Sequence, residues 1–365
     1  MKKRALPSQL IDSALRGAVR EALGRLVPWP RLEAPREKYS IIVGTPWALR
    51  HILDVNLRCI ARCDLPRLDR IHVVLDRPLK PGMEAFADNV RSRWRSLPIH
   101  VQWHAPISGL LAERTNVSTF FNGMNILTAL SECRSRAMVL HDFDLYPLRR
   151  DYFELLASRI LDDDLRFAGL ERTSFDGLTE EDEIYGTWGL AMDAFWLRNE
   201  IRPADVLHRS HKLPDGRRTM LDPFSWLQLH EPRRDGVRGL SPEDVCHVKN
   251  LCSTYLRMSR GQRVRVAWRV HYLVYLEDVA EDTTKRMEDL TRKMLATRGC
   301  ELTVHGQTVD FSGVDWTCSN VLERELNSME TMLFGEMRQV VADFITATRA
   351  FLRVPVESNG PSKAR

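Results

Sequence analysis

Short apolar runs alternate with helical patterns over residues 39–140, and this alternation constrains the fold more than any other feature of the sequence. Four runs are brief and rich in β-branched residues, which predicts strands at 39–44, 71–75, 99–103 and 138–140. Apolar residues recur at i, i+3 and i+4 between these runs, which predicts helices at 49–61, 81–95 and 120–133. Strands that alternate with helices of this length favour a parallel sheet with right-handed crossovers. The sequence therefore predicts an α/β fold.

Two carboxylates, Asp142 and Asp144, directly follow the fourth predicted strand. Because the side chains of a strand alternate, residues i and i+2 point to the same side, and both carboxylates are expected to reach one small volume. Divalent cations take oxygen ligands of this kind and often share them with a substrate diphosphate. The carboxyl ends of strands in an open α/β sheet are also where ligands bind. An ordinary Asp-rich surface turn is the alternative, but the apolar strand before the pair favours a metal site.

An acid pair at a strand end, after a first strand-helix unit, resembles the DXD signature of nucleotide-sugar glycosyltransferases with the GT-A fold. The order of elements over residues 39–256 is similar to that of family 2 of these enzymes. The resemblance implies a GT-A fold, which is Rossmann-like, with a mostly parallel sheet flanked by helices. It also implies that Asp144 ligates a divalent cation, Mn²⁺ or Mg²⁺, and that Asp142 contacts the ribose or a metal-bound water.

The same resemblance implies nucleotide contacts near the ends of the first strands. The second predicted strand ends at Asp76, where family 2 enzymes place an Asp that meets the base. Asp76 is followed by Arg77 and Pro78 rather than by the family's Gly/Ser-type turn, so a simple strand end is the alternative. Asn122 and Asn125 match a cluster that opens the helix before the acid pair, and helix-start polar groups are their alternative. The predicted nucleotide-binding residues are Thr45, Pro46, Asp76, Asn122, Asn125, His141 and Phe143.

A second acidic pair, Glu243 and Asp244, resembles the Glu-Asp pair of family 2 enzymes, whose Asp deprotonates the acceptor hydroxyl. Both are predicted to be catalytic, with Asp244 as the base of an inverting displacement. The alternative is an ordinary helix start, with Ser241 as the N-cap and two acids at the positive end of the helix dipole. On such a helix His247 would share a face with Asp244. The resemblance implies that His247 is a further metal ligand or diphosphate contact, and a structural His is its alternative.

The segment around Trp188 is predicted to bind substrate. Trp188 and Gly189 lie where the GT-A fold passes the donor sugar, an aromatic face suits a sugar ring, and a small residue allows close backbone approach. A core position is the alternative for Trp188. Asp193, just beyond, is either an N-cap or a catalytic group.

These features together predict a metal-dependent glycosyltransferase. It would move a sugar, a hexosyl or related group, from a nucleotide-diphospho-sugar to an acceptor hydroxyl on a glycan, a lipid-linked sugar, a protein or a small molecule. One alternative is a catalytically inactive glycosyltransferase-like scaffold. Another is a nucleotidyltransferase, which would typically need a Gly-rich phosphate loop after the first strand, and the turn at 44–46 supplies little of one.

The composition indicates which class of ligand and which cellular compartment are expected. A net charge of +4 suits an anionic nucleotide but gives no sign of nucleic-acid binding, and no clustered basic stripe is visible. Seven scattered cysteines suggest no disulfide framework and favour a reducing cytoplasm. No apolar run approaches the ~18 residues of a membrane span, and residues 1–4 are not followed by the apolar h-region expected of a signal peptide.

Four parts of the chain are predicted. Residues 1–38 hold a basic amphipathic helix and a linker, and 39–276 form the GT-A catalytic domain. Residues 277–353 form a helical appendage with a small hairpin around His305, and 354–365 form a disordered tail. The N-terminal helix is expected to pack on the domain or on a second subunit, and peripheral membrane contact is the alternative. A homodimer through the terminal helices is a further expectation.

Overall fold

The computed structural model describes residues 7–115, 118–173, 175, 178, 184–213, 215–297 and 299–353, without the side chains of 7–14 and 112–119. The chain divides into two compact units. The first contains Met1–Trp47 and Cys63–Val245, and the second contains Ala48–Arg62 and Cys246–Arg365. The predicted catalytic domain (39–276) and helical appendage (277–353) have other boundaries than these two units. The assignment of these parts as functional domains stays a prediction. The predicted tail at 354–365 lies outside the described residues.

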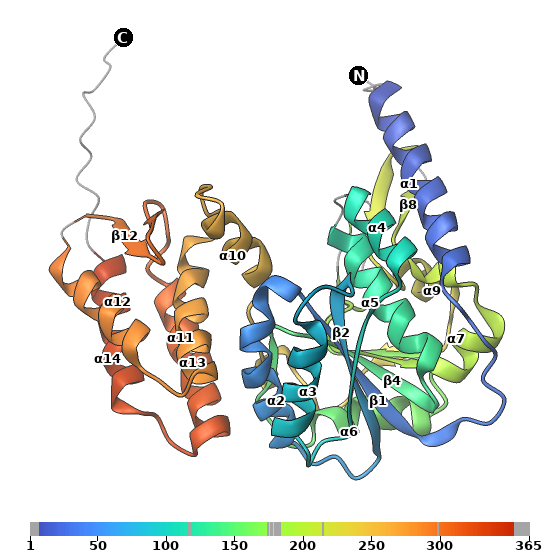
Figure 1. Ribbon diagram of the computed structural model, residues 1–365, viewed down its shortest axis with the longest axis horizontal. Coiled ribbons are helices and arrows are strands. Elements are labelled where there is room, and N and C mark those ends of the chain that lie inside the picture. The colour runs from blue at the N-terminus through green and yellow to red at the C-terminus, as the bar shows by residue number, and fades with distance from the viewer. Residues whose placement is uncertain are drawn as a thin grey trace. The chain divides into compact units, whose positions relative to one another are not determined.

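A seven-stranded sheet forms the centre of the first unit, in the order β10-β6-β7-β4-β1-β2-β3 (Figure 1). Strands β1 to β4 are parallel, as predicted, and β7 runs antiparallel to both of its neighbours. The strands are β1 Arg36–Thr45, β2 Leu68–Pro78, β3 Ile99–His104, β4 Ser135–Asp142, β6 Phe167–Gly169, β7 Leu190–Asp193 and β10 Arg234–Gly236.

Helices cover this sheet, so its central strands are buried on both faces. Ile41, Ile42 and Val43 of β1 have no exposed surface, which explains why the sequence of this strand is continuously apolar rather than alternating. Helix α5 packs on β1, β2 and β3, and α6 packs on β4, β6 and β7. The α/β fold predicted from the sequence, with a mostly parallel sheet flanked by helices, is confirmed. The helices of this unit are α1 Pro7–Leu26, α3 Met83–Arg93, α4 Pro106–Thr115, α5 Ser118–Glu132, α6 Tyr152–Leu161, α7 Ala194–Glu200, α8 Pro203–Val206 and α9 Ser225–His230.

The connections of the sheet reverse direction between β1 and β4. From β1 the chain moves outward through β2 to β3, and it then returns to form β4 on the other side of β1. Gly44 of β1 pairs in register with Asp142 of β4, so both strands end at the same edge. Open α/β sheets bind ligands in the crevice outside the carboxyl ends of strands at such a reversal. The acid pair therefore lies where this topology favours a binding site.

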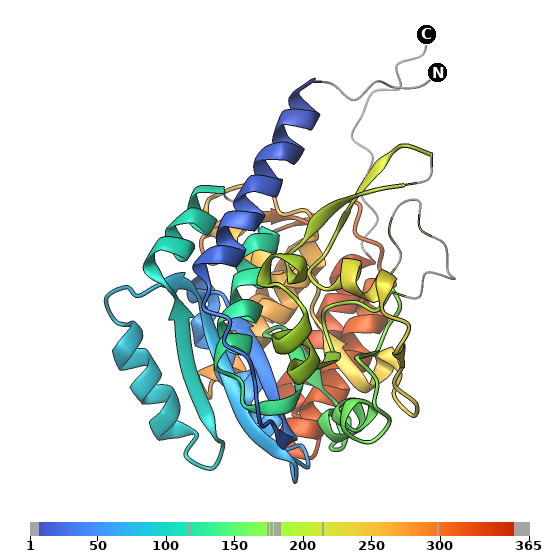
Figure 2. The same cartoon turned by 90° about the vertical axis from the view of Figure 1, so that its right-hand side faces the viewer.

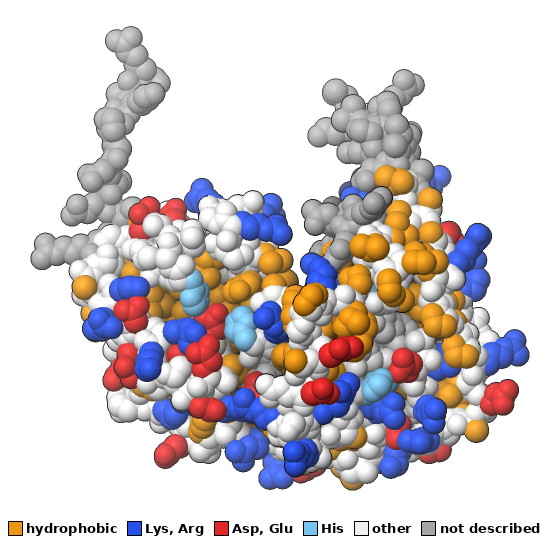
Figure 3. All heavy atoms as spheres, viewed as in Figure 1, with side chains coloured by type: hydrophobic (Ala, Val, Ile, Leu, Met, Phe, Trp, Pro, Cys, Tyr) orange, Lys and Arg blue, Asp and Glu red, His pale blue; other side chains and the backbone are white. Residues whose placement is uncertain are grey.

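The predicted N-terminal amphipathic helix is confirmed as α1, which packs on the first unit. Leu23 is fully buried and belongs to the core that also contains residues of α5 and β4, and Val19 packs against it. Leu15 is 62% exposed. Hydrophobic side chains gather over α1 and α4 on the face shown in Figure 3. Ile107 and Leu110 of α4 are exposed.

Two small pairs of strands complete the first unit. The hairpin of β8 (Arg209–Lys212) and β9 (Arg218–Leu221) lies beside α1 (Figure 2). The short strand β5 (Leu145–Pro147) pairs with β11 (Val245–His247), which follows the 3-10 helix η3 (Pro242–Asp244). The boundary between the two units falls within β11.

The second unit is mostly helical. The hairpin predicted around His305 is confirmed, and His305 and Gly306 at its tip both have positive φ, 50° and 72°. The final helical segment is a pair of helices. The first, α13, ends at its C-cap Gly335, which has φ of 86°, and α14 follows it. In the part of the chain that the structure describes, every helix is too short or too polar to cross a bilayer. The elements are η1 Trp47–Ile52, which begins in the first unit, α2 Leu53–Ala61, α10 Leu251–Ser259, η4 Ala267–Arg269, α11 Val270–Ala280, α12 Lys285–Ala296, β12 Glu301–Val304, β13 Gln307–Asp310, α13 Cys318–Phe334 and α14 Gln339–Leu352.

Candidate functional site

The acid pair lies at the carboxyl end of β4, but the sequence argument for its geometry was only half right. Strand β4 ends at Asp142, and Asp144 lies in the turn that leads to β5. Strand alternation therefore does not bring the two carboxylates together. The turn does so, and the side chain of Phe143 between them is buried, 6% exposed. Asp142 is half-buried, and Asp144 is buried.

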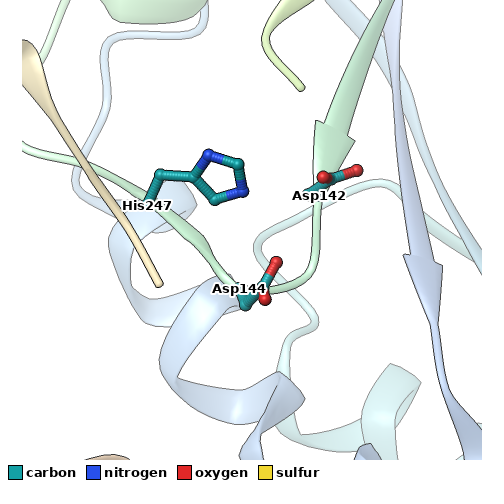
Figure 4. A group of neighbouring side chains, drawn as sticks. All are labelled: Asp142, Asp144 and His247. Carbon is teal, nitrogen blue, oxygen red and sulfur yellow. The ribbon is translucent and has the colours of Figure 1, made fainter. Parts of the chain in front are cut away.

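His247 joins the acid pair through strand pairing rather than through a helix. The helix predicted from Ser241 onward is wrong. The segment forms a single 3-10 turn and then enters β11, which ends at His247. Strand β11 pairs with β5, and β5 directly follows the turn that carries Asp144. One ligand atom from each of Asp142, Asp144 and His247 lies within 4.8 Å of the others, and the three side chains point toward one another (Figure 4).

The charges at this cluster suit a divalent cation. Burial and then the negative charge of Asp222 raise the pKa of Asp142 to about 6. Burial and then the charges of Lys249 and Arg269 lower the pKa of His247 to about 3, so its imidazole is neutral at pH 7. Two carboxylates and a neutral imidazole are ligands of Mn²⁺ and related ions. Ligand atoms on opposite sides of such a cation lie roughly 4–5 Å apart, so the donor set and its spacing fit the predicted metal.

Asp222 is a candidate site residue that the sequence analysis missed. It follows β9 and precedes Pro223, and its pKa is raised by burial. The next residue, Phe224, is buried with φ of 64°, an unusual conformation for a bulky side chain. The backbone N–H of Phe224 donates to the carbonyl of Val206 at 2.9 Å, which fixes this turn. An Asp directly after a short strand of alternating burial was the available signal.

The carboxylate of Asp244 interacts with Ser241 and Arg149. Its carboxylate accepts hydrogen bonds from the backbone N–H and the hydroxyl of Ser241, at 2.7 and 3.3 Å, and lies 3.6 Å from a guanidinium nitrogen of Arg149. The capping arrangement anticipated as the alternative is therefore present. Glu243 beside it is exposed. The catalytic roles of Asp244 and Glu243 stay predictions.

The residues predicted around the nucleotide base lie at the ends of β1 and β2. One carboxylate oxygen of Asp76 accepts a hydrogen bond from the backbone N–H of Trp47 at 2.9 Å, and the other lies 3.3 Å from Arg77. Thr45 is fully buried, and its hydroxyl donates to the carbonyl of Val43 at 3.5 Å. Asp76 thus links the end of β2 to the turn that follows Thr45 and Pro46. Nucleotide contact by Thr45, Pro46 and Asp76 stays a prediction.

Asn125 approaches the same edge of the sheet from α5. Its amide oxygen lies 2.8 Å from Nε2 of His104, and its amide nitrogen would come within 2.7 Å of a Cβ placed on Gly44. A larger residue at position 44 would therefore displace the Asn125 amide, which lies beside the strand position that pairs with Asp142. Asn122, on the same helix, is half-buried. Nucleotide contact by either Asn stays a prediction.

The positions of His141 and Gly189 are explained by packing against their neighbours. His141 is fully buried, with its ring centroid 5.1 Å from that of Phe153, on the side of β4 opposite Asp142. Gly189 has φ of 74°, and a Cβ there would lie 2.6 Å from the hydroxyl of Tyr152. Trp188 is half-buried. The predicted ligand contacts of His141, Phe143, Trp188 and Gly189 stay predictions.

Asp193 is the N-cap of α7. Of the two anticipated roles, N-cap and catalytic group, the structure therefore shows the first. Its carboxylate accepts a hydrogen bond from the backbone N–H of Trp196 at 2.8 Å and also pairs with Arg166. It is 1% exposed.

Three solved glycosyltransferases are similar to this chain. The mannosyltransferase PcManGT from Pyrobaculum calidifontis, in complex with GDP-Man and Mn²⁺, is 14% identical over 94% of this chain and 95% of that chain, with a TM-score of 0.39. TarS 1-349 from S. aureus is 13% identical over 86% and 90%, with a TM-score of 0.37. The galactosyltransferase LgtC, with donor and acceptor sugar analogs, is 11% identical over 54% and 72%, with a TM-score of 0.38.

Models of known protein families and proteins of curated function give no match to the chain. At TM-scores of 0.39 and below, the three structural likenesses assign neither a family nor a function. The functional argument therefore rests on the site.

Proposed function

We propose that this protein is a metal-dependent glycosyltransferase that moves a sugar from a nucleotide-diphospho-sugar to an acceptor hydroxyl. The observation that carries the proposal is the convergence of Asp142, Asp144 and His247, whose ligand atoms lie within 4.8 Å of one another. This cluster lies at the carboxyl end of β4, at the reversal of the sheet, where α/β folds bind nucleotides. A cation site at that position suits a ligand that carries a diphosphate.

The three side chains would hold Mn²⁺ or Mg²⁺. When bound, the cation would neutralise the charge that develops on the departing diphosphate. Above pH 6 the carboxylate of Asp142 is mostly ionised, because its pKa is about 6. The imidazole of His247 is neutral at the same pH and offers a lone pair. Asp142 and His247 therefore present the protonation states that a cation requires.

Transfer needs a base that takes the proton of the acceptor hydroxyl as that oxygen attacks the anomeric carbon and the bond to the diphosphate breaks. Asp244 is the base that the sequence predicts, acting in an inverting displacement. Asp222 is a second candidate because it lies close enough to act on Asp142, and burial raises its pKa, which makes it a stronger base. Asp244 is engaged with Ser241 and Arg149, so we favour Asp222.

A panel of nucleotide-sugars tests the proposal. The protein is incubated with each donor and Mn²⁺, Mg²⁺ or EDTA, and release of nucleoside diphosphate is measured. Release that depends on the cation and is lost in Asp144→Asn supports the proposal. Failure of every donor to react or to stabilise the fold would contradict it. Release of pyrophosphate from a nucleoside triphosphate and a sugar phosphate would instead identify a nucleotidyltransferase.

A further inference from the structure

A basic pocket lies on the first unit, among residues that the proposed transfer does not use. It has a volume of about 230 Å³ and is lined by residues of α1 and of the segment that forms the hairpin of β8 and β9. Four of its lining residues are arginines: Arg16, Arg20, Arg209 and Arg218. The volume is below the roughly 300–1,000 Å³ of pockets for drug-sized ligands, so a small group suits it better than a whole nucleotide-sugar.

The described residues that line this pocket include four arginines and no Asp or Glu. Arg20 pairs with Glu21 at 3.0 Å, and Arg209 pairs with Asp205 at 2.6 Å. Arg218 donates to the hydroxyl of Ser210 at 3.2 Å and forms no ion pair with any residue that the structure describes. The positive charge of Arg218 is therefore not neutralised by a carboxylate of the described residues, and this charge favours an anion.

Buried polar atoms at the pocket have no protein partner. Both ring nitrogens of His208, the Nε of Arg20 and the Nε of Arg209 are buried without a hydrogen-bond partner among the described residues. His208 is 4% exposed and lines the pocket, and its ring packs against Phe120 with centroids 4.4 Å apart. Buried polar groups are normally hydrogen-bonded, so an exception of this kind needs an explanation. A bound ligand that accepts several hydrogen bonds would provide this explanation.

Arg209 is held in place, which lowers the entropy that it loses on binding an anion. The guanidinium carbon of Arg209 lies 3.9 Å from the ring centroid of Trp226, a cation–π contact that fixes the side chain together with its ion pair. Arg16 and Arg20 are one turn apart on α1 and therefore share a face of the helix. Arg218 lies on β9, so the donors come from both walls of the pocket.

We propose that this pocket, formed by Arg16, Arg20, His208, Arg209 and Arg218, binds a phosphate group. A phosphate offers several charged acceptor oxygens to the guanidinium groups, and arginine is the residue best suited to bind it. The group could belong to a soluble phosphorylated molecule or to the headgroup of an anionic lipid. The site is separate from the acid pair and does not depend on the proposed transferase activity.

Binding of inorganic pyrophosphate to the full chain tests this proposal. Titration is monitored by calorimetry in EDTA, because binding at the acid pair is expected to need a cation. Arg218→Gln and Arg20→Gln should each weaken binding by at least about tenfold, as expected when a hydrogen bond to a charged group is lost. The matched controls are Arg217→Gln, on the same hairpin and paired with Asp215, and Arg25→Gln, exposed on α1. Neither control residue lines the pocket, so both variants should bind as the wild type does.

Vesicles of phosphatidylcholine, with or without phosphatidic acid, distinguish the two sources of phosphate. Sedimentation with acidic vesicles that is lost in Arg218→Gln and displaced by pyrophosphate supports a lipid headgroup in the pocket. Pyrophosphate binding without vesicle binding supports a soluble ligand. Absence of pyrophosphate binding by the wild type, or equal binding by Arg218→Gln and Arg217→Gln, would overturn the proposal. Melting temperatures without ligand confirm that each variant is folded.

Discussion

Asp142 and Asp222 interact across the site, although one ends β4 and the other follows β9. Burial and then the charge of Asp222 raise the pKa of Asp142 to about 6, and burial also raises the pKa of Asp222. A buried carboxylate that lies near a second, ionised carboxylate is destabilised when it ionises. A bound cation would relieve this repulsion, so the relationship links the metal site to the stability of the metal-free protein.

Asp144→Asn should abolish cation-dependent donor turnover. Loss of one ligand removes several kcal/mol of transition-state stabilisation, which corresponds to a fall in rate of at least about 100-fold. The fold should survive, because the substitution keeps the size of the side chain and removes a buried charge. The measurement is the rate of nucleoside diphosphate release with Mn²⁺.

The matched control for this variant is Asp88→Asn on α3, where Asp88 is exposed and pairs with Arg91. It should leave turnover unchanged. Equal turnover by Asp144→Asn and Asp88→Asn would show that Asp144 does not ligate a catalytic cation.

Stability of the metal-free protein should fall as pH rises through 6. The pKa of Asp142 is raised in the folded state from its ordinary value of 3.8 to about 6. Between these values the folded state binds more protons than the unfolded state, so ionisation of Asp142 destabilises the fold, by on the order of 1–3 kcal/mol. In EDTA, Asp142→Asn should therefore melt above the wild type at pH 8, and the difference should shrink at pH 5.

Mn²⁺ should raise the melting temperature of the wild type more at pH 8 than at pH 5, because protonation of Asp142 competes with the cation. An equal rise at both values would mean that Asp142 lacks either the raised pKa or the contact with the ion.

The sequence predicted the sheet better than it predicted the site. Apolar runs identify buried strands because burial on both faces leaves little freedom of composition, as at Ile41, Ile42 and Val43. The position of His247 could not be predicted, because it depends on the pairing of β11 with β5, a contact between segments far apart in the chain. A Ser-Pro-Glu-Asp start is favourable for a helix, but only three residues of helix form before β11 begins. Asp222 was missed for a similar reason, since only the fold brings it near Asp142.

Leu23→Ala should destabilise the protein strongly, whereas Leu15→Ala should not. Leu23 is fully buried in the core, and Leu15 is 62% exposed on the same helix. A buried Leu→Ala change costs about 2–5 kcal/mol, while surface substitutions usually stay within about 0.5 kcal/mol. Urea unfolding of both variants measures this difference. Equal stabilities would show that α1 is detached from the first unit in solution.

Glu277→Gln should destabilise the second unit near neutral pH. Burial alone would raise the pKa of Glu277, but His305 at 2.8 Å and His51 at 3.3 Å outweigh it and lower the pKa to about 2. A lowered pKa stabilises the fold above the ordinary value of 4.5, and this contribution is lost as pH falls toward 2. The loss at pH 7 should be on the order of 1–3 kcal/mol, and it should disappear in acid. Glu281→Gln, which removes an exposed pair with Arg286, is the control and should cost at most about 1 kcal/mol.

Asp222→Asn and Asp244→Asn together identify the base. Replacing the true base keeps donor binding but slows transfer by roughly 10²–10⁴-fold, the usual contribution of general base catalysis. We expect this loss in Asp222→Asn. Asp244→Asn should retain most of the rate and lose about 0.5–1.5 kcal/mol of stability, because it weakens the hydrogen bonds to Ser241 and the contact with Arg149. Single-turnover rates with a saturating donor, measured beside the melting temperatures, separate the two effects. A slow Asp244→Asn and a normal Asp222→Asn would return the catalytic role to Asp244, and normal rates in both would exclude either residue as the base.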